Sequence, residues 1–325
     1  MKPAKKDQPN VDFFDTLVAE EDSQADLLAG LLQEQKVVSP KWFYDMEGSE
    51  LFEAITQLPE YYPTRTEIGI LTDNKNSISE RLGVDSVIIE PGSGSSEKIR
   101  LLLNAVRPAA YIPVDISADF LREAAIALGQ EFPWLQIRAV CADFNTSWSF
   151  LNHLPSGKRI VFYPGSTLGN LEPEAAKRFL LRVKEIVGNR GGLLVGVDLH
   201  KETAVLHAAY NDSAGVTGRF NMNLLKRLNL ELGAEFDLSR FRHHAFYNEE
   251  KQRIEMHLVS LETHTVRCRG ANLTFEAGES IHTENSYKYT PARFESLAAS
   301  AGLQIEQSWH DERSLFGVHY LSPCD

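Results

Sequence analysis

Between residues 84 and 198, short continuous apolar runs alternate with stretches whose apolar side chains recur every three or four positions. A run of β-branched residues such as Val87-Ile88-Ile89 is typical of a strand buried on both faces, whereas the longer spacing is typical of a helix. The predicted strands are 86–89, 110–114, 136–140, 159–163 and 192–197, and the predicted helices are 96–106, 117–130 and 173–187. This alternation predicts a parallel sheet with right-handed crossovers and a ligand at the carboxyl ends of its strands.

The segments outside this region follow other patterns. A helical pattern runs from about 13 to 35, and residues 201–250 indicate mostly helical or irregular structure. β-like runs return in "RIEMHLVSLETHTVRC" and "NLTFEAGESIHTENSYKY", a helix is predicted in "PARFESLAASAGL", and "QIEQSWHDERSLFGVHYLSP" is expected to close the sheet as a hairpin. We therefore expect an α/β fold with a nucleotide-binding core at 64–200 plus 288–325 and a second lobe at 11–63 plus 201–287.

Composition narrows the class of function. With 325 residues, 43% hydrophobic and 24% charged, the chain has the composition of a soluble globular protein. No apolar run approaches membrane-spanning length and "MKPAKKDQPNVDFF" lacks the apolar core of a signal peptide, so we expect a cytoplasmic monomer without a membrane partner. The net charge of −12 disfavours a nucleic-acid partner. Three scattered cysteines and ten histidines without ligand-like spacing predict neither disulfides nor a metal site.

A turn with two glycines links the first predicted strand to its helix, in "VIIEPGSGSSEKIRLLL". Gly92 and Gly94 allow a ligand to approach bare backbone, and Ser95 or Ser96 can cap the helix. The spacing departs from a phosphate-binding loop, and the third glycine of the dinucleotide fingerprint is missing. Glu90 would repel a pyrophosphate and attract a cationic ligand. Glu90-x-Gly92-x-Gly94 resembles the nucleotide-binding turn of Rossmann-like methyltransferases, whose donor S-adenosylmethionine is cationic, while a purely structural turn is the alternative.

Acidic residues follow the next two predicted strands. Asp115 lies 21 residues beyond Gly94, where a carboxylate can accept hydrogen bonds from both ribose hydroxyls. Asp143-Phe144 can offer a carboxylate to the adenine amino group and a backbone N–H to the ring. An aspartate at a strand end also commonly caps the next helix. Two such acids beside the glycine turn favour S-adenosylmethionine over a nicotinamide cofactor.

The fourth predicted strand ends in "YPGSTLGNL". Gly165 and Gly169 permit close backbone approach, and the amide of Asn170 can both donate and accept hydrogen bonds. A neutral amide beside a methyl donor suits an amine nucleophile, because it orients the lone pair without adding a competing base. An ordinary turn asparagine is the alternative from this stretch alone.

Several blocks together resemble the L-histidine N-alpha-methyltransferase family of ergothioneine biosynthesis. The blocks are "WFYD", "GSELFEAITQLPEYYPTR", "EPGSGSSEK", "GSTLGNL", "YNDSAGVTGRFNMNLL", "IEM" and "HTENSYKY". Their order covers the chain from about residue 38 to its end. The resemblance implies a Rossmann-like class I methyltransferase sheet with a second, substrate-binding lobe.

The resemblance also implies roles for individual residues. Tyr61, Asn170 and Tyr210 would hold the substrate carboxylate, Tyr44 would face the amine, and Gly165 would line the pocket with its backbone. Tyr44 and Asn170 would be the catalytic pair.

Further positions follow from the same resemblance. Glu284 and Ser286 would recognise the imidazole, and Met256 would pack beside it. The residues implied in cofactor binding are Gly92, Lys98, Asp115, Asp143 and Phe144, to which the glycine-turn pattern adds Glu90 and Gly94.

The implied reaction is trimethylation of the α-amine of L-histidine to hercynine, with S-adenosylmethionine as methyl donor and no metal. Two other classes remain open from the residues alone, a nicotinamide-dependent oxidoreductase and a protein that senses S-adenosylmethionine without chemistry. Within the methyltransferases, the alternative is N-methylation of another amino acid or of a histidine derivative.

Overall fold

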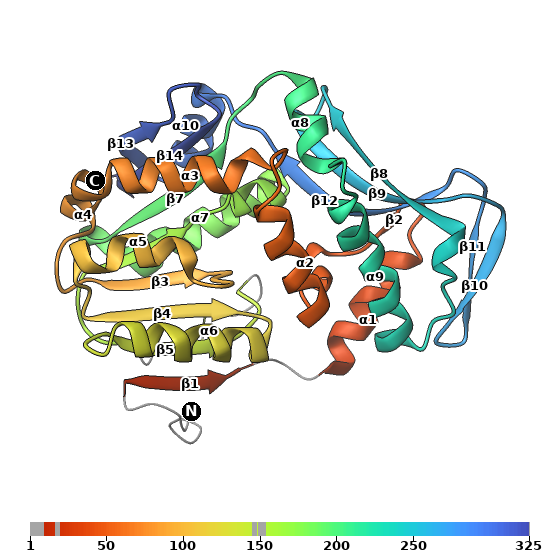
Figure 1. Cartoon of the computed structure of the whole chain (residues 1–325), viewed down its shortest axis with the longest axis horizontal. Coiled ribbons are helices and arrows are strands. Elements are labelled where there is room, and N and C mark those ends of the chain that lie inside the picture. Colours follow the sequence, from red (N-terminus) through yellow and green to blue (C-terminus); the bar gives the residue numbers. More distant parts are fainter. Residues whose placement is uncertain (1–9, 17–19, 145–147, 149–153, 325) are drawn as a thin grey trace. The chain divides into compact units, whose positions relative to one another are not determined.

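A computed structural model describes residues 10–16, 20–144, 148 and 154–324 and divides into two compact units (Figure 1). Unit 1 consists of Met1–Leu17, Pro63–His200 and Lys288–Asp325. Unit 2 consists of Val18–Tyr62 and Lys201–Tyr287. Each unit therefore combines segments that are far apart in the sequence.

In the described part of unit 1, eight strands form one sheet. The strands are β1 (Val11–Asp15), β3 (Val87–Pro91), β4 (Ala110–Asp115), β5 (Gln136–Cys141), β6 (Arg159–Tyr163), β7 (Gly192–Asp198), β13 (Leu303–His310) and β14 (Phe316–Pro323). Their order is β1-β5-β4-β3-β6-β7-β14-β13, and all neighbours are parallel except β14, which runs antiparallel to β7 and β13. The chain order reverses between β3 and β6, which is the switch point where doubly wound sheets bind ligands.

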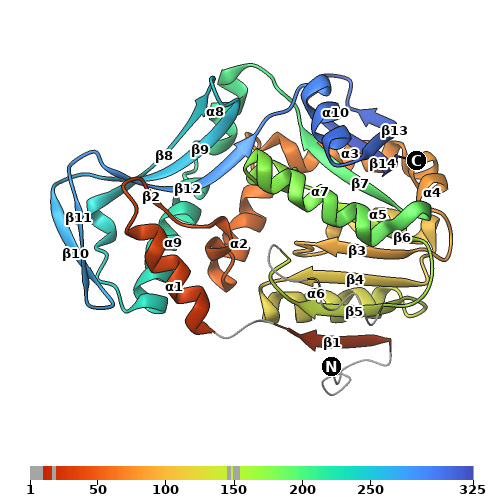
Figure 2. The ribbon, with the colours of Figure 1, turned by 180° about the vertical axis from the view of Figure 1, so that it is seen from behind.

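Helices cover both faces of this sheet. They are α3 (Tyr62–Asp73), α4 (Lys75–Leu82), α5 (Glu97–Val106), α6 (Ala118–Glu131), α7 (Pro173–Val187) and α10 (Pro291–Ser300). Figures 1 and 2 together show α4, α5 and α6 on one face and α7 and α10 on the other. The apolar side of α5 illustrates the packing, because Ile99, Leu102, Leu103 and Val106 recur at helical spacing and are all buried. Within the described residues, none of the helices has the length and apolar character that crossing a bilayer requires.

Unit 2 contains a second, smaller sheet with helices. Its sheet has the order β2-β12-β9-β8, formed by β2 (Lys36–Val37), β12 (Ser280–Tyr287), β9 (Arg253–Ser260) and β8 (Phe241–Asn248). A separate hairpin pairs β10 (His264–Cys268) with β11 (Ala271–Phe275). The helices are α1 (Glu20–Leu31), α2 (Met46–Thr56), α8 (Thr203–Tyr210) and α9 (Val216–Leu232). The helix α9 packs on β8, β9 and α2 and buries Phe220, Leu224, Leu225 and Leu228.

The predicted core strands and helices, the closing hairpin β13–β14 and the helix α10 are confirmed. The predicted helix from about residue 13 is wrong at its start, because Val11–Asp15 forms a strand parallel to β5. This strand joins the sheet of unit 1. Residues 11–15 therefore belong to unit 1, whereas we expected them in the second lobe. Within 201–250 the prediction missed β8, whose buried Phe241, Ala245 and Tyr247 alternate only irregularly with polar residues.

Candidate active site

The glycine turn after β3 is fixed to the end of β4. The N–H of Gly92 donates to the carbonyl oxygen of Val114 at 2.7 Å, and the N–H of Gly94 donates to Oδ2 of Asp115 at 3.0 Å. The N–H of Ser117 donates to Oδ1 of Asp115 at 3.0 Å. Both glycines have positive φ, 68° and 51°, a conformation that favours glycine. The carboxylate of Asp115 therefore fixes the glycine turn to the end of β4, at the edge of the sheet where doubly wound folds bind ligands.

Phe144 lies beside the same turn. A Cβ built on Gly92 would be 3.5 Å from its ring, and the ring packs edge-on against Tyr163 with centroids 6.1 Å apart. Asp143 and Phe144 follow β5, whose last residue Cys141 pairs with Asp115. The structure therefore brings the predicted cofactor residues of three neighbouring strands to one end of the sheet of unit 1.

Glu90 is buried at 2% exposure at the end of β3. Its Oε2 accepts a hydrogen bond of 2.6 Å from the Tyr111 hydroxyl, which also lies 3.0 Å from Oγ of Ser96. Ser96 occupies the N-cap position of α5, yet its side chain makes no capping bond. Burial raises the pKa of Glu90 to about 8, with a smaller opposing effect of the Tyr111 hydrogen bond. Burial therefore opposes the negative charge that the sequence pattern assigned to Glu90.

Glu67, which sequence reasoning missed, connects two predicted site residues. Its carboxylate is 1% exposed, pairs with Nζ of Lys98 at 2.7 Å and accepts the N–H of Gly165 at 2.9 and 3.1 Å. A Cβ on Gly196 would lie 2.0 Å from Oε1 of Glu67, so this glycine makes room for the carboxylate. The sequence contains one signal for this role. Glu67 lies four residues before Leu71 on the apolar side of α3, where a charged side chain is expected only with a buried partner.

The segment that carries Asn170 is a short helix, η3 (Thr167–Asn170), after β6. It is preceded by Ser166, which has a φ of 57° and whose Oγ accepts the N–H of Asp198 at 2.9 Å. Asp198 forms a buried ion pair with Lys288 at 2.8 Å. Asn170 itself is half-buried. The hydrogen bond from Asp198 to Ser166 ties the turn before Asn170 to the end of β7, beside the switch point.

In unit 2, the predicted tyrosines lie in one aromatic cluster. Tyr61 packs against Tyr210 with ring centroids 6.4 Å apart, and Phe52 contacts both Tyr61 and Tyr44 at 6.4 and 5.8 Å. The hydroxyl of Tyr210 donates to Oγ of Ser286 at 2.8 Å. Four of the residues predicted to bind substrate, including Ser286, are therefore linked within this unit.

A β-bulge places the remaining predicted residues of unit 2. In β12 the register shifts between His282 and Glu284, so Glu284 pairs with Met256 while His282 pairs with His257. Without this shift Glu284 would point to the same face of the sheet as His282. With it, Glu284 and Ser286 share the face of Met256, as the prediction for the imidazole-binding side chains requires.

The reversed strand order and the glycine turn fit the sheet of a Rossmann-like, class I methyltransferase that depends on S-adenosylmethionine. The model of a family described as histidine-specific, S-adenosylmethionine-dependent methyltransferases matches residues 23–323. The chain belongs to this family. It is therefore an enzyme that uses S-adenosylmethionine and acts on a small amino-acid substrate.

Three relatives illustrate the similarity. The chain is 43% identical over 306 residues to a histidine N-alpha-methyltransferase of Mycolicibacterium smegmatis, covering 92% of this chain and 94% of the relative. It is 41% identical over 300 residues to the protein of that name from Mycobacterium tuberculosis, covering 90% and 92%. It is 27% identical over 299 residues to ergothioneine biosynthesis protein 1 of Neurospora crassa, covering 86% of this chain and 32% of that longer protein.

Proposed function

We propose that the protein transfers methyl groups from S-adenosylmethionine to the α-amine of L-histidine. Three transfers give the betaine hercynine, as the first step of ergothioneine biosynthesis. The observation that carries this proposal is the similarity to histidine N-alpha-methyltransferases over at least 90% of the chain. The similarity to an ergothioneine biosynthesis protein supports the pathway.

We propose that the carboxyl end of the sheet in unit 1 holds the cofactor. Asp115 would accept hydrogen bonds from the ribose hydroxyls, and Asp143 and Phe144 would contact adenine. The full set of cofactor residues is Glu90, Gly92, Gly94, Lys98, Asp115, Asp143 and Phe144. The position of Asp115 at the end of β4, beside the glycine turn that its carboxylate holds, supports this assignment.

The substrate carboxylate would be held by neutral donors. Tyr61, Tyr210 and Asn170 can each donate a hydrogen bond without adding a charge. Tyr44 would face the amine, and Gly165 would contribute its backbone. The packing of Tyr61 on Tyr210 supports a common role for these two side chains.

The imidazole would be recognised by Glu284 and Ser286, with Met256 against the ring. A carboxylate accepts a hydrogen bond from a ring N–H, which apolar side chains cannot donate. The pairing of Glu284 with Met256 and the bond from Tyr210 to Ser286 support this grouping.

S-Adenosylmethionine supplies a methyl group that its sulfonium already activates. The residues of the chain align the amine, with Asn170 and Tyr44 orienting its lone pair after the ammonium proton has left. Alignment of this kind contributes up to about 7–11 kcal/mol to rate enhancement. Because the sulfonium already makes the methyl group electrophilic, we expect no metal in the transfer step. We also predict that the enzyme is a cytoplasmic monomer without nucleic-acid or membrane partners.

The substrate is tested by measuring release of S-adenosylhomocysteine with a panel of amines. The panel contains histidine, its mono- and dimethylated α-amine derivatives, tryptophan and tyrosine. We expect the highest kcat/KM for histidine and its methylated derivatives. A higher value for another amino acid would keep the methyltransferase class and replace the substrate.

A further inference from the structure

The β-bulge in β12 contains one extra residue, Thr283. The register of β12 against β9 passes from His282 directly to Glu284, so Thr283 and Glu284 together lie opposite Met256. The side chain of Thr283 is buried at 1% exposure. Because the bulge decides on which face of the sheet Glu284 lies, the contacts that hold the bulge bear on the proposed recognition of the imidazole.

A buried asparagine of the helix α9 binds the hydroxyl of this extra residue. Oγ1 of Thr283 lies 2.8 Å from Oδ1 of Asn221 and 3.0 Å from the carbonyl oxygen of Met256, and it can donate its proton to either. Asn221 is 0% exposed and lies on the side of α9 where Phe220 and Leu224 are also buried. A buried amide in such apolar surroundings destabilises the fold unless its hydrogen bonds are made.

The amide of Asn221 extends the hydrogen bonds to a residue predicted to bind substrate. Its Nδ2 donates to the carbonyl oxygen of His257 at 3.0 Å and to Nδ1 of His243 at 2.9 Å. An imidazole that accepts at Nδ1 carries its proton on Nε2, and Nε2 of His243 donates to the carbonyl oxygen of Tyr210 at 2.9 Å. Tyr210 is the last residue of α8, and its hydroxyl donates to Ser286. The bulge and the end of α8 are therefore joined by one series of hydrogen bonds.

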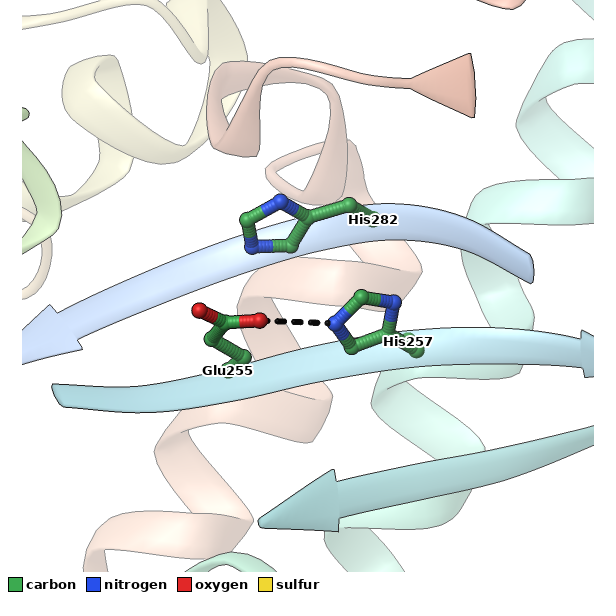
Figure 3. A group of neighbouring side chains, drawn as sticks. All are labelled: Glu255, His257 and His282. Atoms are coloured by element: carbon green, nitrogen blue, oxygen red, sulfur yellow. Dashed lines mark hydrogen bonds and ion pairs between the residues drawn. The ribbon is translucent and has the colours of Figure 1, made fainter. Parts of the chain in front are cut away.

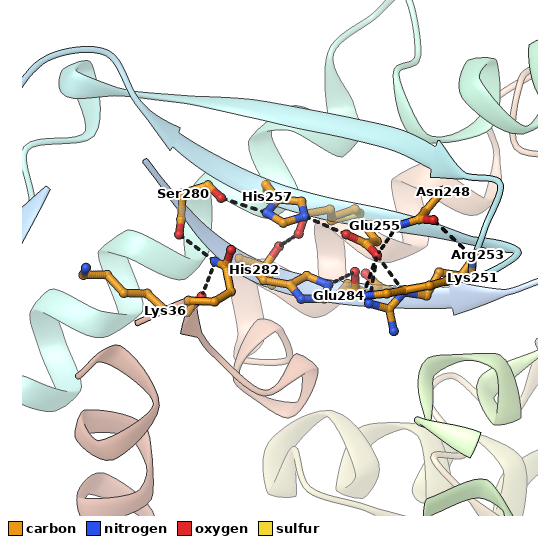
Figure 4. Close-up of polar contacts among 12 residues, drawn as sticks. Lys36, Asn248, Lys251, Arg253, Glu255, His257, Ser280, His282 and Glu284 are labelled. Atoms are coloured by element: carbon orange, nitrogen blue, oxygen red, sulfur yellow. Dashed lines mark hydrogen bonds and ion pairs between the residues drawn. The ribbon is translucent and has the colours of Figure 1, made fainter. Parts of the chain in front are cut away.

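On the opposite face of the sheet, a histidine holds the backbone of the bulge. Nε2 of His282 donates to the carbonyl oxygen of Glu284 at 3.1 Å (Figure 4). The ring of His282 stacks on that of His257, with centroids 4.6 Å apart and an interplanar angle of 8° (Figure 3). His257 is fixed in turn by Oε2 of Glu255 at 3.2 Å and Oγ of Ser280 at 3.0 Å. Side chains on both faces of the sheet thus hold the bulge.

We propose that Thr283 and His282 are positioning residues for recognition of the substrate imidazole, with Asn221 anchoring Thr283 on α9. They hold the bulge in the conformation that directs Glu284 to the face of Met256. A carboxylate distinguishes a ring N–H from other groups only when its own position is fixed to within about 0.5 Å. The inference rests on the proposed function, because both residues act on the substrate only through Glu284.

The test is kcat/KM for histidine in the parent, in Thr283→Val and in Thr283→Ser. Thr283→Val keeps the branched shape but removes the hydroxyl, so the buried Oδ1 of Asn221 loses its donor. We expect this variant to lower kcat/KM about ten-fold. Thr283→Ser keeps the hydroxyl and should restore most of the activity.

The same substitution in a Glu284→Ala background separates positioning from a general loss of stability. If Thr283 acts through Glu284, Thr283→Val should lower kcat/KM less than about two-fold in that background. A general loosening of unit 2 would lower it by the same factor in both backgrounds. Thr265→Val removes an exposed hydroxyl from β10 in the same unit, and this matched control should behave like the parent.

If Thr283→Val fails to fold, His282→Phe decides the test in the same two backgrounds. It keeps an aromatic ring beside His257 and removes the donor to the carbonyl oxygen of Glu284. The proposal is overturned if the parent methylates histidine and the deciding variant lowers kcat/KM no more than Thr265→Val does, or equally with and without Glu284. A parent that leaves histidine unmodified would instead contradict the proposed function, and this proposal with it.

Discussion

The carboxylate of Asp115 accepts hydrogen bonds from the N–H groups of Gly94 and Ser117, which fix the glycine turn. We propose a second role for it, in accepting hydrogen bonds from the ribose hydroxyls. The sequence predicted the second role from the position of an acid at a strand end. It could not predict the first, because that depends on the turn lying beside β4. The role of Glu67 was also hidden, since its partner Lys98 lies 31 residues away on another helix.

Asp115→Ala should weaken cofactor binding by ~1.5–3 kcal/mol, the usual contribution of hydrogen bonds to a charged group. Calorimetric titration with S-adenosylhomocysteine measures the loss. Asp119→Ala, an exposed acid in the first turn of α6, is the control and should leave affinity unchanged. Equal affinities of the two variants would remove Asp115 from the cofactor site.

Glu90 should make the protein less stable as pH rises. Burial raises its pKa from 4.5 to about 8, so between these values the folded state binds more protons than the unfolded state. Glu90→Gln keeps an acceptor for the Tyr111 hydroxyl but cannot ionise. The free energy of unfolding of the variant minus that of the parent should therefore increase from about pH 5 to pH 8, as urea denaturation can measure. A pH-independent difference would mean that Glu90 titrates normally.

Glu284→Ala should cost histidine turnover about 10- to 100-fold, from roughly 1.5–3 kcal/mol of charge-assisted hydrogen bonding. Turnover of tryptophan should not fall, because its side chain does not need this carboxylate. The measurement is kcat/KM for both substrates, with the exposed Glu250→Ala as control. If the ratio between the substrates does not change, the imidazole is recognised elsewhere.

At the scale of elements, the hydrophobic pattern predicted most strands of the sheet in unit 1, including the hairpin β13–β14 at one edge, and missed β1 at the other edge. The strands β3 and β7 are buried along their whole length, because helices cover both faces of the sheet, and they read as largely apolar runs. The five-residue strand β1 lies at the edge of the described sheet and pairs with β5. Its sequence mixes apolar and acidic residues in a pattern that is equally compatible with a helix. The bulge in β12 cannot be recognised from the amino-acid sequence of the strand, yet it decides on which face of the sheet the side chain of Glu284 lies.

The helix α3 depends on the buried ion pair of Glu67 with Lys98. Glu67→Gln should destabilise unit 1 by about 3 kcal/mol or more, because it leaves a largely buried cation without its partner. Glu131→Gln removes the exposed ion pair with Arg100 and should cost less than about 1 kcal/mol. Urea denaturation of both variants tests the difference. If both variants lose a similarly small free energy of unfolding, the ion pair of Glu67 with Lys98 does not stabilise unit 1 appreciably.

At the scale of the whole molecule, each unit is assembled from distant segments. The order of strands around the switch point follows from right-handed crossovers, so the doubly wound class of the sheet was predictable from the sequence. The pairing of β9 with β12 was not, because antiparallel register depends on bulges and turns that the sequence does not specify. The contact of His257 with Glu255 and the stacking of His257 on His282 (Figures 3 and 4) therefore had no signal in the spacing of the histidines.

The most direct test of the proposed function is mass spectrometry of L-histidine incubated with the purified chain and S-adenosylmethionine carrying an isotopically labelled methyl group. We expect products with one, two and finally three labelled methyl groups, all assigned to the α-nitrogen by fragmentation. Label on the imidazole ring, or transfer to another amino acid while histidine remains unmodified, would contradict the proposed function.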